Sequence, residues 1–345
     1  MKRIFFALFV LGLSMACKNT DRKEGNTPKQ EVNVYTHRHY PPDQELFAQF
    51  EKETGIQVNV VNASADELIQ KMQLEGTASP ADVLITVDAG RLVRAKEKGL
   101  LQSVQSDILD SIVPSHLRDG DKQWFALTKR ARVIVYAKDR IDPEQLSSYE
   151  DLASDVWKGR LLIRSSSNIY NQSLMASLIA NLGAEKAKAW AAQIVDNMAR
   201  DPKGNDRDQV KAVVAGEGDL AIVNTYYVGR MINSDDPVEA NAGKGVGIYF
   251  PNQNDRGTHV NISGAGVAKY APNKGNAIRF IEFLAGTEAQ AVFAEANYEY
   301  PVNKNVEVAP LLKSWGSFKE DNLELSKLGT NNKSAVLLFD EVNWK

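Results

Sequence analysis

The sequence predicts an α/β protein of two domains with no flexible linker between them. Segments with strand character alternate with segments of helical periodicity along most of the 345 residues. The chain that follows the N-terminal leader has roughly 300 residues, enough for two domains. No stretch rich in Pro or Gly separates two halves. We therefore expect a discontinuous arrangement, in which the chain crosses between domains more than once and leaves a cleft between them.

The first part of the chain predicts three successive strand–helix pairs. The first helix carries Leu46, Phe47 and Phe50 on one face, and the second begins at Ser64 with Glu67 three residues later, the pattern of a capping box. Such alternation is typical of a parallel sheet. The expected strands are 32–35, 56–61 and 81–87, and the expected helices are 43–53, 64–74 and 88–98.

The same alternation continues through the rest of the chain. Strands are expected at 132–137, 160–163, 219–223 and 262–268, and helices at 171–182, 184–198, 206–215, 274–285 and 287–295. We assign residues 31–129 with 252–305 to one lobe, and residues 130–251 with 306–345 to the other.

The N-terminus has the pattern of a secretory leader. Lys2 and Arg3 precede a short apolar run, and a small residue stands before Cys17. This end is similar to the lipobox of bacterial lipoproteins, although Ser14 stands where that pattern usually has Leu. We expect a signal peptide at 1–16, lipidation of Cys17 and a tether at 17–30, so that a monomer is anchored at the periplasmic or cell-envelope face. An ordinary cleaved leader is the alternative.

Composition and motifs exclude several classes of function. Cys17 is the only cysteine, so zinc ribbons and iron–sulfur clusters are excluded. The formal net charge is −3, and no basic block indicates a nucleic-acid partner. The chain has no Gly-x-Ser-x-Gly elbow, His-Glu-x-x-His motif or phosphate-binding loop, and we expect that it is not an enzyme.

Tyrosines stand at several predicted junctions between strands and helices. Tyr226 and Tyr227 are adjacent, and Tyr40 and Tyr170 occupy similar places far away in the sequence. Adjacent side chains diverge on a strand or a helix, so a pair of ligands is plausible only at an irregular junction or a helix start. A single tyrosine is more often a packing residue, and composition alone leaves both interpretations open.

If these loops meet, four phenol oxygens and His39 converge on one point. Phenolate is a hard anionic ligand, and the charge of Fe³⁺ best offsets the cost of deprotonating several such groups. Four phenolates around Fe³⁺ carry one negative charge, which a nearby guanidinium would balance. Arg38, Arg130 and Arg132 are the candidates for this role, or for binding an anion.

The chain resembles the ferric-ion-binding proteins of bacterial iron ABC importers, and is most similar to the tyrosine-clamp type that is common in cyanobacteria. The resemblance covers nearly the whole chain beyond the leader. The segments that carry it are 32–40, 79–91, 127–136, 157–160, 164–172, 218–229 and 261–267.

The resemblance implies a two-lobed, transferrin-like periplasmic-binding-protein fold of type II with a hinged cleft. It places the family's histidine and first tyrosine on His39 and Tyr40, its middle tyrosine on Tyr170, and its paired tyrosines on Tyr226 and Tyr227. It further implies that Fe³⁺ is the transported ligand, with carbonate or water as an additional ligand in some members, and that an ABC permease is the partner. The alternative is a protein of the same fold that binds a polyamine, thiamine or an oxyanion.

Overall fold

The structure of the chain is a computed structural model that describes residues 30–38 and 40–345. The predicted signal peptide, Cys17, nearly all of the predicted tether and His39 lie outside the described residues. Within the described part of the chain, none of the helices has the length and apolar character that crossing a membrane requires.

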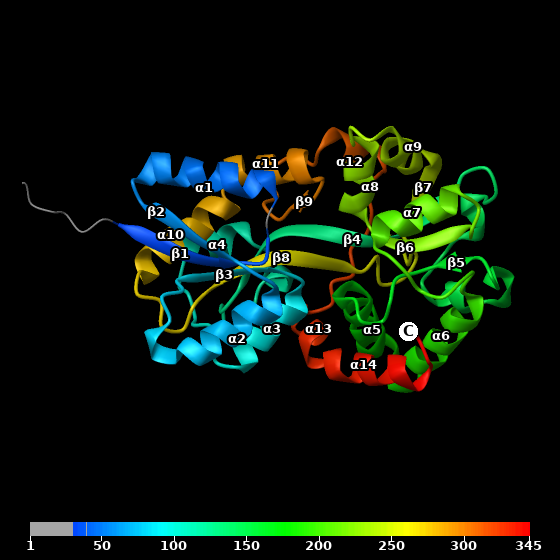
Figure 1. Ribbon diagram of the computed structural model, residues 1–345, viewed down its shortest axis with the longest axis horizontal. Coiled ribbons are helices and arrows are strands. Elements are labelled where there is room, and N and C mark those ends of the chain that lie inside the picture. Colours follow the sequence, from blue (N-terminus) through cyan, green and yellow to red (C-terminus); the bar gives the residue numbers. More distant parts are fainter. Residues whose placement is uncertain (1–29, 39) are drawn as a thin grey trace, which may run out of the picture.

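Helices cover both faces of a long twisted sheet (Figure 1). In the N-terminal part, each predicted strand and helix forms close to its expected limits. Leu46, Phe47 and Phe50 are buried on one face of their helix, and both hydrogen bonds of the Ser64–Glu67 capping box are present. The elements are β1 (Glu31–Thr36), α1 (Pro41–Thr54), β2 (Gln57–Asn62), α2 (Ala65–Glu75), β3 (Val83–Val87), α3 (Ala89–Glu97) and α4 (Asp107–Ile112).

The middle of the chain builds the other end of the sheet and the helices around it. These elements are β4 (Phe125–Ala137), β5 (Leu161–Leu162), α5 (Ile169–Leu182), α6 (Ala184–Asn197), α7 (Asp206–Val214), β6 (Leu220–Asn224), α8 (Thr225–Ile232), α9 (Pro237–Gly245) and β7 (Val246–Tyr249).

The C-terminal part of the chain returns to the end of the sheet formed by β1, β2 and β3, and its last helix then packs at the other end. Its elements are β8 (Val260–Val267), α10 (Lys274–Ala285), α11 (Thr287–Asn297), β9 (Tyr300–Pro301), α12 (Pro310–Ser314), α13 (Ser326–Thr330) and α14 (Asn332–Glu341). Short 3₁₀ turns connect several of these elements. The sequence did not predict α4, α9, α12, α13 or α14.

The sheet is mixed, which corrects the prediction of a parallel sheet. The strand order is β2-β1-β3-β8-β4-β6-β5, with β7 and β9 also paired to β4. β1 pairs with β2 and β3 in parallel, as predicted, but β8 is antiparallel to β3 and β4. The reason is that β8 enters from the other end of the sheet, where the chain has already formed β6 and β7, and therefore runs in the opposite direction.

Strand β4 connects the two lobes. Its first half pairs with β8 up to Ala131, and its second half pairs with β6 from Arg132 onward. The chain thus passes from one lobe to the other along an extended strand. Figure 1 shows β4 and β8 running side by side through the middle of the molecule.

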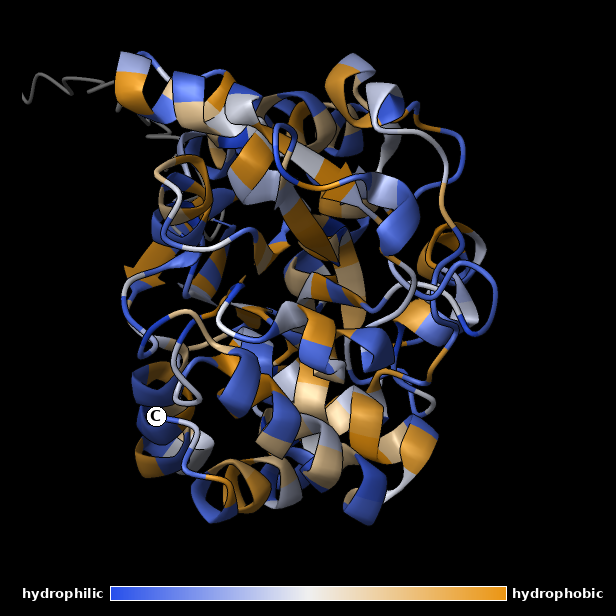
Figure 2. Cartoon of the chain, turned by 90° about the vertical axis from the view of Figure 1, so that its right-hand side faces the viewer, coloured by the Kyte–Doolittle hydropathy of each residue, from blue (hydrophilic) through white to orange (hydrophobic). Residues whose placement is uncertain are grey.

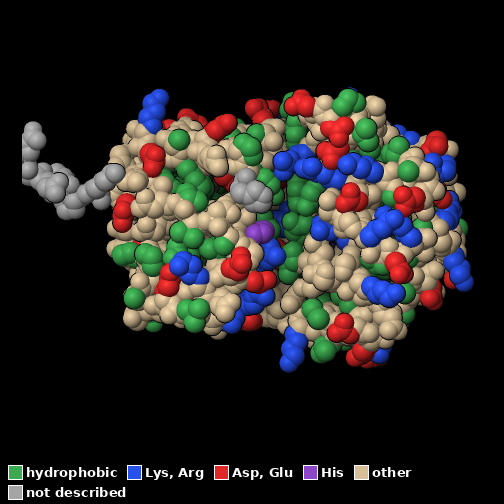
Figure 3. All heavy atoms as spheres, in the orientation of Figure 1, with side chains coloured by type: hydrophobic (Ala, Val, Ile, Leu, Met, Phe, Trp, Pro, Cys, Tyr) green, Lys and Arg blue, Asp and Glu red, His purple; other side chains and the backbone are tan. Residues whose placement is uncertain are grey.

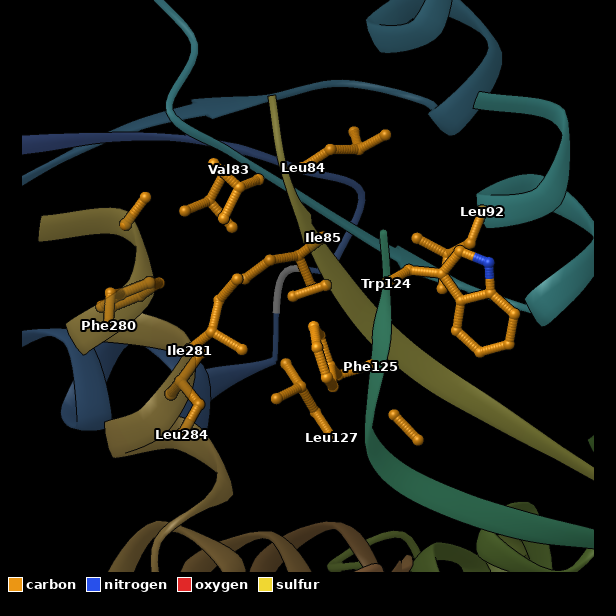
Figure 4. Packing of buried hydrophobic residues seen from close by; sticks show 14 of the residues in the cluster. Val83, Leu84, Ile85, Leu92, Trp124, Phe125, Leu127, Phe280, Ile281 and Leu284 are labelled. Carbon is orange, nitrogen blue, oxygen red and sulfur yellow. The ribbon is translucent and has the colours of Figure 1, made fainter. Parts of the chain in front are cut away.

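Separate hydrophobic cores hold the lobes. In the first, residues of β3, β4 and α10 meet, among them Ile85, Phe125 and Phe280 (Figure 4). The second lobe has one cluster around Trp190 on one side of the sheet and another around Val223 on the other. Figure 2 shows hydrophobic strands inside and hydrophilic stretches on the outer helices. The lobe limits given above stay a prediction.

A buried carboxylate at the end of β3 also joins the lobes. Asp88 precedes α3 with a φ of 81°, a value that is uncommon for a residue other than glycine. Its oxygens accept hydrogen bonds from the Ser173 hydroxyl of α5 at 2.7 and 2.9 Å and from the Asn261 amide of β8 at 2.8 Å. These bonds compensate for the strained backbone and connect elements of both lobes.

Candidate metal centre

The tyrosine pair lies where β6 ends and α8 begins. Asn224 is the last residue of β6 and the N-cap of α8, with extended backbone angles. Thr225 and Tyr226 are buried, whereas Tyr227 is half-buried. The rings of Tyr226 and Tyr227 stack with centroids 4.3 Å apart and planes inclined by 30°. The predicted strand-to-helix junction is therefore confirmed, and it allows neighbouring phenols to lie on the same side.

Tyr170 approaches the pair from α5. It is the second residue of that helix, and its backbone N–H donates to the side chain of the N-cap residue Asn168 at 3.0 Å. The hydroxyl oxygens of Tyr170 and Tyr226 are 3.2 Å apart, within hydrogen-bond distance. The fold thus brings the hydroxyls of two tyrosines that are 56 positions apart in the sequence into contact.

Tyr40 reaches this region from the first lobe. It is the N-cap residue of α1, directly after His39, which is not described. The guanidinium carbon of Arg38 lies 5.0 Å from the centroid of the Tyr40 ring, and that of Arg230 in α8 lies 5.2 Å from it. Tyr40 therefore lies between one cation of its own lobe and one of the other. Figure 3 shows a hollow between the two halves, with side chains of the hydrophobic class, which includes Tyr, inside it and Lys or Arg side chains along its edge.

Three arginines surround the ring of Tyr170. The guanidinium carbons of Arg130, Arg132 and Arg164 lie 5.6, 5.9 and 5.7 Å from its centroid. Arg130 is 2% exposed, and none of its three guanidinium nitrogens has a hydrogen-bond partner among the described residues. A buried guanidinium of this kind can receive an anionic oxygen.

The other two predicted arginines already have partners. Arg38 forms two hydrogen bonds to the Asp43 carboxylate at 3.0 and 3.1 Å and another to Glu299 at 3.2 Å. Arg132 donates to Asp206 at 2.8 Å and to Asn171 at 2.8 Å. Their positive charges act on the tyrosine rings, while their hydrogen-bonding groups largely hold the surrounding chain in place.

The sequence did not single out Arg164, Arg230 or Asp206, which lie close to the predicted residues. Arg164 begins one of the segments that carry the resemblance, and Arg230 follows Gly229 directly. The chain has 41 Lys and Arg residues, and only their contacts in the folded protein distinguish Arg164 and Arg230 from the others.

Burial disfavours the ionised form of Tyr40, Tyr170 and Tyr226, and so raises the pKa of each. Burial raises the pKa of Tyr226 well above its usual value, and the charges that Tyr170 and Tyr40 would carry raise it further. The pKa of Tyr170 is also raised, mainly by burial and then by Tyr227, while Arg130 opposes the shift. For Tyr40, burial and the Glu299 carboxylate raise the pKa, and Arg38 opposes them.

Such a group of phenols can bind a hard cation and release protons in exchange. Each phenolate that forms would raise the cost of the next one, and only a cation of high charge placed among them reverses this repulsion. Among the described residues, no cluster of three or more His, Cys, Asp or Glu side chains is arranged to hold a metal ion.

The chain is similar to proteins named for iron. It is 51% identical to iron uptake protein A1 of Synechocystis over 96% of this chain and 93% of that protein. A Trichodesmium protein solved in complex with iron and citrate ligands has 51% identity and a TM-score of 0.89, covering 91% of this chain and all of that one. A ferric binding protein from Campylobacter jejuni has 46% identity and a TM-score of 0.87, with the same coverage.

These similarities confirm the predicted two-lobed fold and the resemblance to ferric-ion-binding proteins. They also confirm that the chain is a binding protein rather than an enzyme. The sequence profile of the bacterial extracellular solute-binding proteins matches residues 35–291. The chain therefore belongs to the family of bacterial extracellular solute-binding proteins.

Proposed function

We propose that this protein captures ferric iron in the cleft between its lobes and delivers it to an ABC-type importer. The ligands are the phenolates of Tyr40, Tyr170, Tyr226 and Tyr227, together with His39. The observation that carries this proposal is the 3.2 Å contact between the hydroxyls of Tyr170 and Tyr226, beside the stacked ring of Tyr227. The iron-related names of relatives with 46–51% identity agree with it.

The charges around the site suit a ferric cargo. Four phenolates and Fe³⁺ carry one negative charge in total, and Arg130 offers a buried cation whose nitrogens have no partner among the described residues. Arg130 therefore either balances this charge or binds carbonate as an additional ligand. Arg38 and Arg132 contribute positive charge from positions fixed by Asp43 and Asp206. A polyamine would instead need carboxylates in place of these cations and phenols. Thiamine and an oxyanion are not favoured because the relatives of 46–51% identity are named for iron.

Binding from both lobes explains how cargo and conformation are linked. Tyr40 lies in the first lobe, and the other three phenols lie in the second. A cation bound to all four holds the cleft closed, and loss of the cation releases the lobes. The closed form is the one that we expect the permease to recognise.

The location follows from family membership, and the anchor is part of the proposal. The protein works outside the cytoplasmic membrane, in the periplasm, as a monomer tethered by lipid on Cys17. If Cys17→Ser still fractionates with membranes as the wild type does, the lipid anchor is wrong.

The direct test of function is a ferric titration of the metal-free protein, with iron supplied as ferric citrate. Ligation by phenolate produces a visible charge-transfer band, so we expect a coloured complex with one iron per chain. Each single Tyr→Phe substitution at the four positions is expected to shift the band and weaken iron binding at least about tenfold, or about 1.4 kcal/mol. Tyr270→Phe, at an exposed tyrosine, is the matched control. A wild-type protein that stays colourless would overturn the proposal.

A further inference from the structure

Asp206 is a fully buried carboxylate whose hydrogen bonds among the described residues go to none of the four predicted tyrosine ligands. It is the first residue of α7 and has 0% exposure. Its Oδ2 accepts hydrogen bonds from Arg132 Nη1 and from the backbone N–H of Asn224, both at 2.8 Å. Its Oδ1 accepts a hydrogen bond from Arg164 Nη1 at 3.0 Å.

Each of the three residues that donate to Asp206 lies beside a tyrosine of the second lobe or precedes one in the chain. Arg132 and Arg164 lie against the ring of Tyr170. Asn224 is the N-cap of α8, whose second and third residues are Tyr226 and Tyr227. A single carboxylate thus connects the surroundings of Tyr170 with the backbone that positions the pair.

Further hydrogen bonds, made by the side chain of Asn171, connect Arg132 with the backbone of Arg164. Arg132 Nη2 donates to Asn171 Oδ1 at 2.8 Å, and Asn171 Nδ2 donates to the carbonyl oxygen of Arg164 at 2.8 Å. Asn171 follows Tyr170 in α5. The start of α5, the end of β6 and the two guanidinium groups are therefore held in one hydrogen-bonded unit centred on Asp206.

We propose that Asp206 is a positioning residue for ferric iron, fixing the three phenols of the second lobe in the arrangement that the metal requires. This inference rests on the proposed function. Without the carboxylate, three guanidinium groups would share a buried space and repel one another, and Arg132 and Arg164 would leave their places beside Tyr170. Phenol oxygens that must rearrange before binding give weaker binding, because part of the binding free energy is spent on ordering them.

A positioning role and a purely electrostatic role predict opposite results. Asp206→Asn keeps the shape of the side chain but removes a negative charge near the phenols. By charge alone, this change favours phenolates and tightens ferric binding. If Asp206 acts by positioning, the substitution weakens binding, because the guanidinium groups and the start of α8 are no longer held together.

Asp219→Asn is the matched control. Asp219 also accepts hydrogen bonds from two arginines, Arg140 and Arg160, each at 2.7 Å. It directly precedes β6, whereas Asp206 bonds to the residue at the other end of that strand. The control therefore breaks a similar carboxylate bridge in the same lobe, away from the phenols.

The experiment compares wild type, Asp206→Asn, Asp219→Asn and Arg164→Lys by ferric binding in competition with citrate and by the visible band of the ferric complex. We expect Asp206→Asn to bind at least tenfold more weakly with a shifted band, and Asp219→Asn to stay within twofold with the band unchanged. Arg164→Lys keeps the positive charge but loses the planar group, so we expect binding at least threefold weaker. Circular dichroism and thermal unfolding verify that each variant is folded.

The possible outcomes separate this inference from the proposed function. Failure of the wild-type protein to bind ferric iron would overturn both. Wild-type binding together with unchanged or tighter binding by folded Asp206→Asn would overturn only the role of Asp206, as would equal effects at Asp206 and Asp219. If Asp206→Asn does not fold, Arg164→Lys decides, and wild-type affinity and colour in that variant would contradict the inference.

Discussion

At the scale of single residues, the site depends on phenols that are costly to ionise and cations that reduce this cost. Burial raises the pKa of Tyr40, Tyr170 and Tyr226, so these three hydroxyls are costly to ionise in the metal-free protein. Arg130 opposes the shift at all three. Because each ligating phenol must lose a proton, ferric affinity is expected to fall as the pH falls.

The buried imidazole of His259 provides a test of this electrostatic environment. Burial and the charges of Arg132 and Arg130 lower its pKa from 6.5 to about 3. Between these two values the unfolded chain binds a proton that the folded chain does not, so the free energy of unfolding falls as the pH falls below about 6.5. The effect of one such group is at most about 1.4 kcal/mol per pH unit.

We therefore expect metal-free wild-type protein to lose more stability between pH 7 and pH 5 than His259→Gln does. Urea unfolding of both proteins at the two pH values measures the difference. The same loss of stability in both would show that His259 is not protonated on unfolding and that its surroundings are not as described.

The sequence predicted the tyrosines because they stand at predicted junctions between strands and helices and because they match the tyrosines of the family that the chain resembles. It could not identify Asp206, since an acidic residue at the start of a helix is usual for capping reasons alone. Its contacts with Arg132, Arg164 and Asn224 depend on three segments that only the fold brings together.

At the scale of elements, the junction between β6 and α8 decides the geometry of the pair. Asn224 leaves the strand in extended conformation, and the helix begins at once, so that Tyr226 and Tyr227 stack. The helix is also held by close packing at its middle. A Cβ added to Gly229 would lie 2.6 Å from the Cβ of Tyr298, which follows α11.

Gly229→Ala is therefore expected to push α8 away from Tyr298. We expect a loss of about 1–3 kcal/mol in the free energy of unfolding, typical of overpacking, and weaker ferric binding because α8 carries the tyrosine pair. Gly275→Ala is the control, since it also changes a helical glycine but has no heavy atom within 4 Å of the added Cβ. Equal effects of the two substitutions would mean that the contact with Tyr298 does not hold α8.

Local patterns predicted the long elements well, but they did not give the direction of β8 or the late helices. Strand β8 has the composition of a buried strand in either direction, and its antiparallel pairing with β3 follows only from where the chain enters. Helices α12 and α13 have five residues each, too short for a helical period to be evident.

At the scale of the whole molecule, elements from distant parts of the chain link the two lobes. Strand β4 pairs with strands of both, and Asp88 accepts hydrogen bonds from Ser173 and Asn261. Leu325 and Leu328 in the C-terminal region pack into the core of the first lobe, whereas Phe339 packs into the second. In the tyrosine region the lobes also contact each other through side chains, since Arg230 of α8 lies beside the ring of Tyr40.

Composition and length indicated two lobes, and family resemblance indicated how they are arranged. Neither could show that Arg230 of one lobe lies against Tyr40 of the other, because this contact exists only when both lobes are in place. The central claim of the account concerns the same interface, namely that one ferric ion is bound by phenols from both sides.

The most direct test is a crystal structure of the iron-loaded protein with anomalous scattering measured at the iron absorption edge. The account predicts a single strong peak within bonding distance of the phenol oxygens of Tyr40, Tyr170, Tyr226 and Tyr227. A peak located elsewhere, or one bound only by residues of the second lobe while Tyr40 remains apart, would contradict it.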